Sequence, residues 1–292
     1  MERVTYLLFK TFKFIINLIP DKLSYYLAQG LGSFLYYVIK DRRELASNNI
    51  QRSLRVSESR ARELTKEVFQ DLAVKFVEIL KVEQRDLTEL QENVTVEGEE
   101  YLKEVQASDK GAVLFTGHFG NWELLGIYLA AVGYPLTAIA RDFKNEYIYQ
   151  EIMEIRQSTG AEVFNRSQIK KSIKALLKQK FLLIAGDQDA HEGGEFMQFF
   201  DRPASTPIGP VRLAQRSNSY LVPVYLAREG FNNYRLIVKK PLEIAKDADI
   251  EKQREVLQKL TTSLEDVIRD YPSQWLWVHR RWKTKLEDGS DD

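Results

Sequence analysis

From about residue 94 onward the sequence alternates between short apolar runs and amphipathic segments, and this alternation constrains the fold more than any other feature. Short apolar runs are typical of buried strands, whereas apolar residues that recur every three or four positions indicate helices. Their repeated alternation predicts an α/β fold, with a mostly parallel central sheet flanked by helices. The predicted strands are 112–116, 136–140, 161–164, 181–185, 219–227 and 234–238, and the predicted helices lie near 121–133, 144–158, 167–180 and 209–217.

Polar residues gather directly after several of the predicted strands. In sheets of this kind, the loops beyond the carboxyl ends of the strands form the binding site. The sequence therefore predicts a functional site at this edge of the sheet. The polar clusters are GHFGNWE at 117–123, RDF at 141–143, NRS at 165–167 and DQDAHEGGE at 187–195.

The first cluster places His118 five positions before Glu123. If His118 lies in the loop and Glu123 in the first helical turn, the carboxylate can reach one ring nitrogen, and the other nitrogen can take a proton from a hydroxyl. The backbone N–H groups of Gly120 and Asn121, near the start of the helix, are predicted to stabilise an oxyanion. By itself the pattern is common and more typical of a capped helix start with an incidental histidine.

Three arginines, Arg141, Arg156 and Arg166, lie after predicted strands or in the helix between them. Guanidinium groups at such positions suit the phosphate or carboxylate groups of a ligand, because they donate paired hydrogen bonds. Ordinary surface salt bridges are the alternative for each of them.

Asp187, Asp189 and His191 form a D-x-D-x-H run. These side chains are possible ligands of a divalent metal, which would make the protein a metallohydrolase. No other histidine cluster completes such a site, so we interpret the run as a carboxylate loop that positions an arginine or a sugar hydroxyl.

Composition excludes several kinds of chemistry. The chain has no cysteine, which rules out disulfides, cysteine nucleophiles and thiolate metal sites. Lysine and arginine together number 42, as do aspartate and glutamate, so the charge balance does not support a nucleic-acid partner. The phosphate-loop motif is missing. No G-x-S-x-G motif presents a serine nucleophile, which favours direct attack by an acceptor over a covalent intermediate.

Residues 1–40 are predicted to form membrane-associating helices. Lys10, Lys13 and Asn17 form a narrow polar stripe on an otherwise apolar segment, a pattern typical of helices that lie in the membrane interface. No run reaches the roughly 18 apolar residues of a spanning helix, and the apolar part is not followed by the cleavage site of a signal peptide. Two ordinary core-facing helices are the alternative.

The rest of the chain, residues 41–292, is assigned to one α/β domain. Its first part, 41–92, is highly charged and favours helix, and we interpret it as a helical lead-in that packs on the core.

Taken together, these segments resemble the bacterial lipid A late acyltransferases, the lauroyl and myristoyl transferase family. Each motif is weak by itself, but the ordered set is specific and runs through most of the chain. The shared motifs are HFGNWE at 118–123, the arginine at 141, NRS at 165–167 with its lysine-rich helix, GDQD at 186–189, FFDRPASTPIGPVRLAQRSNSYLVPVY at 199–225 and YPSQWLWVHRRWK at 271–283.

The resemblance implies an O-acyltransferase that moves a fatty acyl chain from a thioester, on acyl carrier protein or coenzyme A, to a hydroxyl of a membrane glycolipid such as a lipid A precursor. It implies no metal or organic cofactor, and a location at the cytoplasmic face of the inner membrane. The family's catalytic dyad corresponds to His118, as general base, and Glu123, which would orient the imidazole. The implied substrate-binding residues are Arg141, Arg156, Asn165, Arg166, Asp187 and Asp189.

Two other functions stay open. A hydrolase of lipids or thioesters could use the same pair with water as the acceptor, and a glycolipid-binding protein would need no catalysis. In the closing motif, the tryptophans are expected to pack with basic groups turned toward lipid headgroups, although a catalytic role for His279 is also open.

Overall fold

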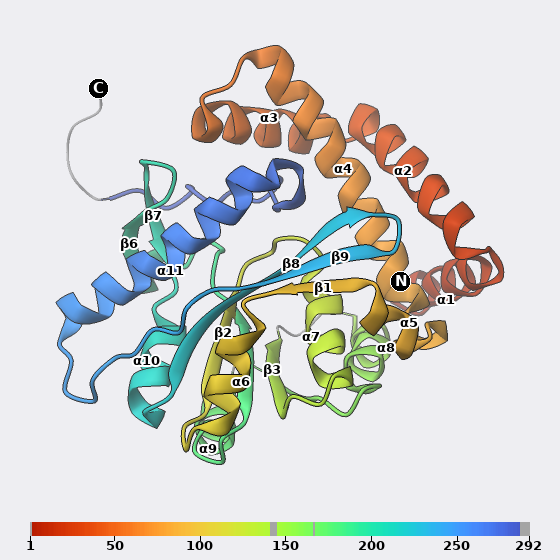
Figure 1. Cartoon of the computed structure of the whole chain (residues 1–292). Coiled ribbons are helices and arrows are strands. Elements are labelled where there is room, and N and C mark those ends of the chain that lie inside the picture. Colours follow the sequence, from red (N-terminus) through yellow and green to blue (C-terminus); the bar gives the residue numbers. More distant parts are fainter. Residues whose placement is uncertain (1, 141–144, 166, 287–292) are drawn as a thin grey trace.

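One central sheet organises the chain in the computed structural model, which describes residues 2–140, 145–165 and 167–286. Its seven strands are β1 (Val94–Glu97), β2 (Ala112–Thr116), β3 (Leu136–Ala140), β4 (Glu162–Asn165), β5 (Phe181–Ala185), β8 (Tyr220–Gly230) and β9 (Asn233–Val238). Their spatial order is β1-β9-β8-β2-β5-β3-β4, and every pair except β8 with β9 is parallel (Figure 1). The predicted mostly parallel sheet is therefore confirmed.

Helices cover both faces of this sheet and extend beyond one edge. The long helices are α1 (Glu2–Leu18), α2 (Asp21–Val38), α3 (Lys40–Leu54), α4 (Glu58–Lys81), α5 (Leu87–Glu92), α6 (Glu99–Ala107), α7 (Trp122–Ala131), α8 (Glu146–Gln157), α9 (Ile169–Leu176), α10 (Gly209–Ser217) and α11 (Ile250–Asp270). Three short 3-10 helices are η1 (Val82–Gln84), η2 (His191–Gly193) and η3 (Pro272–Gln274). A small antiparallel hairpin of β6 (Glu195–Gln198) and β7 (Pro203–Thr206), which the sequence pattern did not predict, lies outside the sheet.

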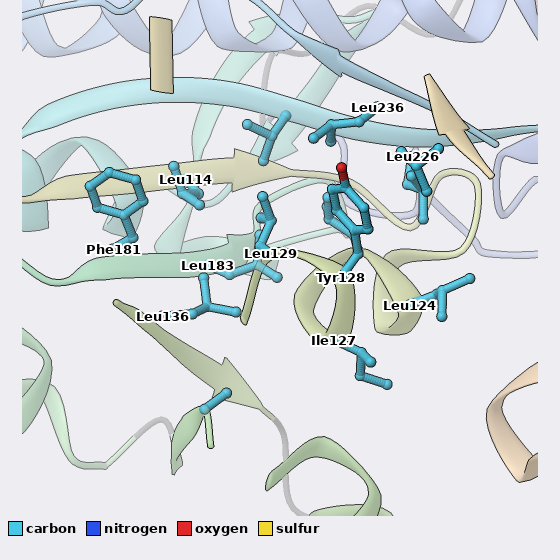
Figure 2. Close-up of a cluster of buried hydrophobic side chains, with 14 of the residues drawn as sticks. Leu114, Leu124, Ile127, Tyr128, Leu129, Leu136, Phe181, Leu183, Leu226 and Leu236 are labelled. Carbon is cyan, nitrogen blue, oxygen red and sulfur yellow. The ribbon is translucent and has the colours of Figure 1, made fainter. Parts of the chain in front are cut away.

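The core consists of two layers separated by the sheet, because successive side chains of a strand point to opposite faces. On β2, Leu114 packs with Leu129 of α7, whereas Val113 belongs to the cluster that includes α10 and α11. Figure 2 shows the first layer, in which Leu183 of β5 and Leu226 of β8 also lie close to α7. Because both faces of these strands are buried, their sequences are continuous apolar runs.

The first two helices pack against α4 and leave much of their surface exposed. On α2, Gly32 allows this close approach, because a Cβ there would lie 2.5 Å from the Cα of Gln70. Only Ile16 of α1 and Ser24, Ala28 and Gly32 of α2 are buried, so most apolar side chains of the two helices are not covered by the core. Among the described residues, no helix has the length and apolar character needed to cross a membrane.

Candidate active site

His118 and Asp187 meet at the carboxyl edge of the sheet. Strands β2 and β5 are parallel neighbours in which Thr116 pairs with Ala185. His118 follows Thr116 by two residues, and Asp187 follows Ala185 by two residues. The backbone N–H of His118 donates to Oδ2 of Asp187 at 2.7 Å, and the ring Nδ1 lies 2.7 Å from Oδ1. Because an ionised carboxylate only accepts hydrogen bonds, Nδ1 carries a proton and Nε2 of the neutral ring is an acceptor.

Charge and hydrogen bonding hold this pair in a defined ionisation state. Burial opposes ionisation of Asp187, but the charge of His118, two hydrogen bonds from His118 and one from Trp275 Nε1 at 2.8 Å outweigh it and lower the pKa of Asp187 to about 2. Burial likewise lowers the pKa of His118, yet the charge and hydrogen bond of Asp187 and the charge of Glu123 raise it above its ordinary value. The imidazole is therefore a strengthened base beside a permanent carboxylate.

The predicted contact between Glu123 and the imidazole is wrong. Glu123 lies in the first turn of α7, and its carboxylate instead forms a paired salt bridge with Arg156 of α8, with N–O distances of 2.7 and 2.6 Å. Asp187 already occupies the ring nitrogen that Glu123 was expected to bind. Glu123 therefore acts on His118 only through its charge, and Arg156 has a carboxylate partner within the protein.

The prediction that Gly120 and Asn121 supply oxyanion donors is also wrong. Their N–H groups donate to the carbonyl oxygens of Gln274 at 3.0 Å and Leu226 at 3.2 Å. Gly120 has φ +52°, and a Cβ there would lie 1.7 Å from the Leu226 oxygen, so only glycine fits this turn. Asn121 caps α7 by accepting from the N–H of Leu124, which leaves it a structural role.

Gln188 occupies the reactive side of the histidine. Its amide Nε2 lies 3.3 Å from Nε2 of His118, and since that ring nitrogen is the acceptor, the amide donates. The Trp122 ring packs edge-on against the imidazole at 5.1 Å between centroids. The side chain of His118 is 22% exposed whereas that of Asp187 is 2% exposed, so the ring is partly accessible while the carboxylate is buried. The sequence pattern placed Gln188 between two acids but did not indicate this contact.

The D-x-D-x-H run does not converge on one point. Asp187 faces His118, whereas Oδ2 of Asp189 contacts His191 at 3.1 Å and accepts from Thr284 at 2.9 Å. Over the described ranges, no group of three or more histidine, aspartate and glutamate side chains could hold a metal ion. The metal interpretation of these three residues is therefore not supported by their geometry.

Asn165, another predicted substrate-binding residue, lies apart from the His118–Asp187 pair. Asn165 ends β4, three strands away from β2, which corresponds to about 14 Å at a strand spacing of about 4.8 Å. Its side-chain oxygen accepts from the N–H and hydroxyl of Ser167 and forms a local turn. Arg141 and Arg166 lie outside the residues that the structure describes.

A C-terminal segment, residues 271–284, which we call the strap, contacts the loop after β2 that carries His118 and the loop after β5 that carries Asp187. Leu276 donates its N–H to the carbonyl of His118 at 3.1 Å, and Trp275 donates to Asp187. His279 accepts from the N–H of Asp189 at 3.3 Å; burial lowers the pKa of His279, which keeps it neutral. Trp275 and Trp277 are fully buried, so the expectation that the tryptophans pack is confirmed for these two. The expectation that the basic groups of this motif turn outward is wrong for Arg281, which is buried and donates to the Ser205 carbonyl and the Thr206 hydroxyl.

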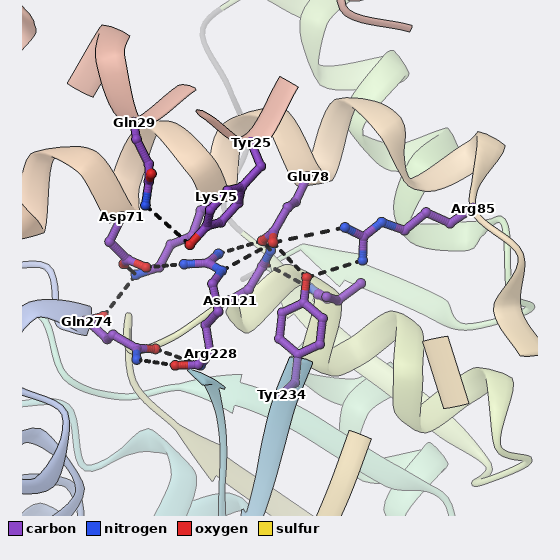
Figure 3. A network of polar contacts seen from close by, with 11 residues as sticks. Tyr25, Gln29, Asp71, Lys75, Glu78, Arg85, Asn121, Arg228, Tyr234 and Gln274 are labelled. Carbon is purple, nitrogen blue, oxygen red and sulfur yellow. Dashed lines mark hydrogen bonds and ion pairs between the residues drawn. The ribbon is translucent and has the colours of Figure 1, made fainter. Parts of the chain in front are cut away.

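A buried polar network joins this strap to α4 (Figure 3). The side-chain amide of Gln274 accepts from the backbone N–H of Arg228 and donates to the backbone carbonyl of Arg228, each at 2.8 Å. The backbone carbonyl of Gln274 accepts from Nζ of Lys75 at 2.8 Å. Glu78 accepts from Arg228, from Tyr234 at 2.6 Å and from Asn121 at 2.8 Å.

The network stays charged in spite of its burial. Burial would raise the pKa of Glu78, but the Arg228 guanidinium above all lowers it to about 2. Arg228 also contacts Asp71, which pairs with Lys75 at 2.5 Å. The residue that caps α7, Asn121, is therefore bound to the ionised Glu78 carboxylate of α4.

Comparison with known proteins indicates the family of the chain. The model of the family described as bacterial lipid A biosynthesis acyltransferase matches residues 2–284. The phosphatidylinositol mannoside acyltransferase of Mycolicibacterium smegmatis is 26% identical over 72% of this chain and 69% of its own. The lipid A biosynthesis lauroyltransferase of Escherichia coli is 26% identical over 92% of this chain and 88% of its own, and the palmitoleoyltransferase is 24% identical over 91% and 87%. The crystal structure of the 1-acyl-sn-glycerophosphate acyltransferase of Thermotoga maritima aligns with 86% of this chain and 99% of its own, at 14% identity and a TM-score of 0.40.

Proposed function

Because the chain belongs to the bacterial lipid A biosynthesis acyltransferase family, we propose that it moves a fatty acyl chain from a thioester to a hydroxyl of a membrane glycolipid such as a lipid A precursor. The thioester is carried by acyl carrier protein or coenzyme A. The observation that carries the proposal is the His118–Asp187 pair, which presents a basic, partly exposed imidazole nitrogen at the edge of the sheet.

In the proposed mechanism, Nε2 of His118 takes the proton of the acceptor hydroxyl while its oxygen attacks the thioester carbonyl. Asp187 stabilises the imidazolium that forms and keeps the ring in the correct tautomer. Collapse of the tetrahedral intermediate expels the thiolate, which takes the proton from His118, so that the free thiol and the ester are the products. No metal or organic cofactor enters these steps, and this remains a prediction.

Gln188 marks the place of the reacting oxygens. The acceptor hydroxyl replaces the Gln188 amide at Nε2 of His118, and the displaced amide stays beside the reaction as a hydrogen-bond donor. A side-chain amide in that position can stabilise the oxyanion of the intermediate, the role that Gly120 and Asn121 cannot fill because their N–H groups are engaged.

Glu123 and Arg156 are proposed to support His118 together. The carboxylate favours the imidazolium through its charge, and Arg156 holds that carboxylate in place. Arg141, Arg166, Asn165 and Asp189 keep their predicted roles toward the acceptor's phosphate and sugar groups as part of the proposal.

We further propose that the α1–α2 hairpin attaches the protein to the membrane at the cytoplasmic face of the inner membrane. The polar stripe of α1 faces the protein, where Lys10 contacts Glu151 at 2.7 Å and Lys13 contacts Glu83 at 2.5 Å. Most apolar side chains of α1 therefore face outward, although Ile16 is buried and Phe9 and Phe12 are half-buried; this is the reverse of an ordinary surface helix. The exposed apolar residues include Leu7, Leu8, Phe14 and Leu18 of α1 and Leu27 and Phe34 of α2. An outward apolar face of this kind suits insertion into the membrane interface.

The test is product analysis with purified protein, glycolipid acceptor and acyl thioester. An acylated glycolipid together with free thiol supports the transferase, and His118→Ala should lower its rate by about 10²–10⁴-fold. Free fatty acid without acylated glycolipid would identify a hydrolase instead. For the membrane proposal, Leu8→Asp with Phe14→Asp should reduce flotation with lipid vesicles, whereas Glu58→Gln on exposed α4 surface should not.

A further inference from the structure

Two neighbouring helices, α9 and α10, carry exposed basic side chains that the reaction chemistry above does not use. The sequence contains no aspartate or glutamate from 166 to 186, nor from 203 to 228. The helices pack against each other. Their exposed cations, which we call the basic face, are Lys170, Lys171, Lys174, Lys178, Arg212 and Arg216.

Most of these cations form no salt bridge with the residues that the structure describes. Within the described part of the chain, the four lysines of the basic face form no salt bridge, although the next lysine, Lys180, pairs with Glu162 at 3.0 Å. Arg212 reaches Glu195 only at 4.0 Å. The local field is therefore positive and open to a ligand, while the chain as a whole has a net charge of zero.

Two large aliphatic side chains lie among the lysines. Ile169 is 48% exposed and Leu177 is 64% exposed. A cationic face with exposed apolar residues suits contact with a folded protein, in which apolar contacts add to the charge attraction, better than contact with small anions.

The basic face begins at the edge of the sheet that holds the site. The first turn of α10 abuts the end of β5, because a Cβ on Gly186, next to Asp187, would lie 3.4 Å from Pro210. Helix α9 follows the carboxyl end of β4. Helices of this length extend about 12–14 Å, and α9 runs back along the sheet from that edge to the opposite edge, where a Cβ on Gly111, just before β2, would lie 2.4 Å from the Leu176 oxygen.

The position of the basic face argues against a lipid surface as its ligand. Figure 1 shows α9 and α10 on the opposite side of the molecule from α1 and α2, which carry the outward apolar residues. A flat membrane that contacts the α1–α2 hairpin would therefore leave the basic face directed to the aqueous side.

We propose that the basic face docks the acidic carrier protein that delivers the acyl thioester on a flexible prosthetic arm. This inference rests on the proposed function, because it names the thioester donor of the same site. The carrier binds on the aqueous side through its acidic surface, and its arm enters the carboxyl edge of the sheet toward His118.

The test compares two donors of the same acyl chain, one on acyl carrier protein and one on pantetheine, which has neither protein surface nor charge. Lys171→Glu with Lys174→Glu should raise the KM for the acyl carrier protein donor about tenfold at low salt. The KM for the pantetheine donor should stay unchanged. The matched control reverses the charge of two exposed lysines outside the basic face, Lys103→Glu with Lys239→Glu. It should leave the KM for both donors unchanged.

Each outcome separates this inference from the proposed function. Equal KM values for wild type and the Lys171/Lys174 variant with the carrier donor would overturn the docking surface, while acyl transfer itself would still stand. Loss of binding to phosphatidylglycerol vesicles by the same variant, with the carrier KM unchanged, would assign the basic face to lipid. Absence of glycolipid acylation by wild type with either donor would instead refute the proposed function.

Discussion

His118 and Asp187 are 69 positions apart in the sequence, yet their side chains are joined at 2.7 Å because each follows its strand by two residues. When two neighbouring strands are parallel and their last residues pair, residues that follow the two strands by the same number of positions lie next to each other. This relationship assigns to Asp187 the contact that a local H-x4-E pattern suggested for Glu123, and it yields several expected outcomes.

Replacing Asp187 with asparagine should lower kcat about 10²-fold or more, with a smaller change in KM. Asparagine keeps the size of the side chain but removes the charge that stabilises the imidazolium. Steady-state kinetics with purified variants would measure this effect. Asp201→Asn is the control, since Asp201 forms an exposed salt bridge with Arg55 away from the site, and equal losses in the two variants would contradict the assignment.

The rate should fall toward acid pH with a midpoint above 6.5. His118 acts as a base only when deprotonated, and Asp187 and Glu123 raise its pKa above the ordinary value of 6.5 in spite of burial. Activity is thus lost as pH falls through this raised pKa, and in Asp187→Asn the midpoint should move to lower pH. The profile of kcat/KM against pH measures both values, and a wild-type midpoint below 6.5 would argue against the pair.

Replacing Gln188 with alanine should lower kcat by about 10²-fold, the effect of removing one oxyanion donor. The amide lies 3.3 Å from Nε2 of His118, where the reacting oxygens are proposed to bind. If Gln188 merely covers the ring in the free protein, Gln188→Ala would leave kcat unchanged or raise it. Kinetics at saturating concentrations of both substrates distinguish these results.

Trp275→Phe should lower the free energy of unfolding by about 1–3 kcal/mol and reduce kcat, because it removes a hydrogen bond to the buried Asp187 carboxylate while it keeps an aromatic ring. Trp277→Phe is a matched control, since that indole donates to the carbonyl of Pro272 instead. Denaturant unfolding and kcat would be measured for both variants. A positioning role predicts that only Trp275→Phe changes kcat.

Glu78→Gln should lower the free energy of unfolding by about 3–5 kcal/mol, because it leaves the buried Arg228 guanidinium without its main counter-charge. On the same helix, Glu63→Gln removes an exposed pair with Arg60 and should change stability by less than about 1 kcal/mol. Chemical denaturation of the two variants gives the comparison, and similar losses would show that the network contributes no special stability.

Local patterns in the sequence determined a large part of this protein. The alternation of apolar runs and amphipathic segments predicted β2, β3, β5 and α10 with their observed bounds, and β4, β8 and β9 within a few residues. The same alternation placed the site at the carboxyl edge, and the ordered motifs indicated the family. These features could be read from the sequence because periodicity, strand ends and motifs are properties of residues close together in the chain.

The tertiary structure alone decided which groups act together. Helix direction turned Glu123 toward Arg156, strand register brought Asp187 to His118, and the strap engaged the N–H of Gly120. Packing against α8 and η1 likewise turned the lysines of α1 inward and most of its apolar side chains outward. Contacts of this kind depend on how distant segments are placed against one another, and no local pattern in the sequence records that placement.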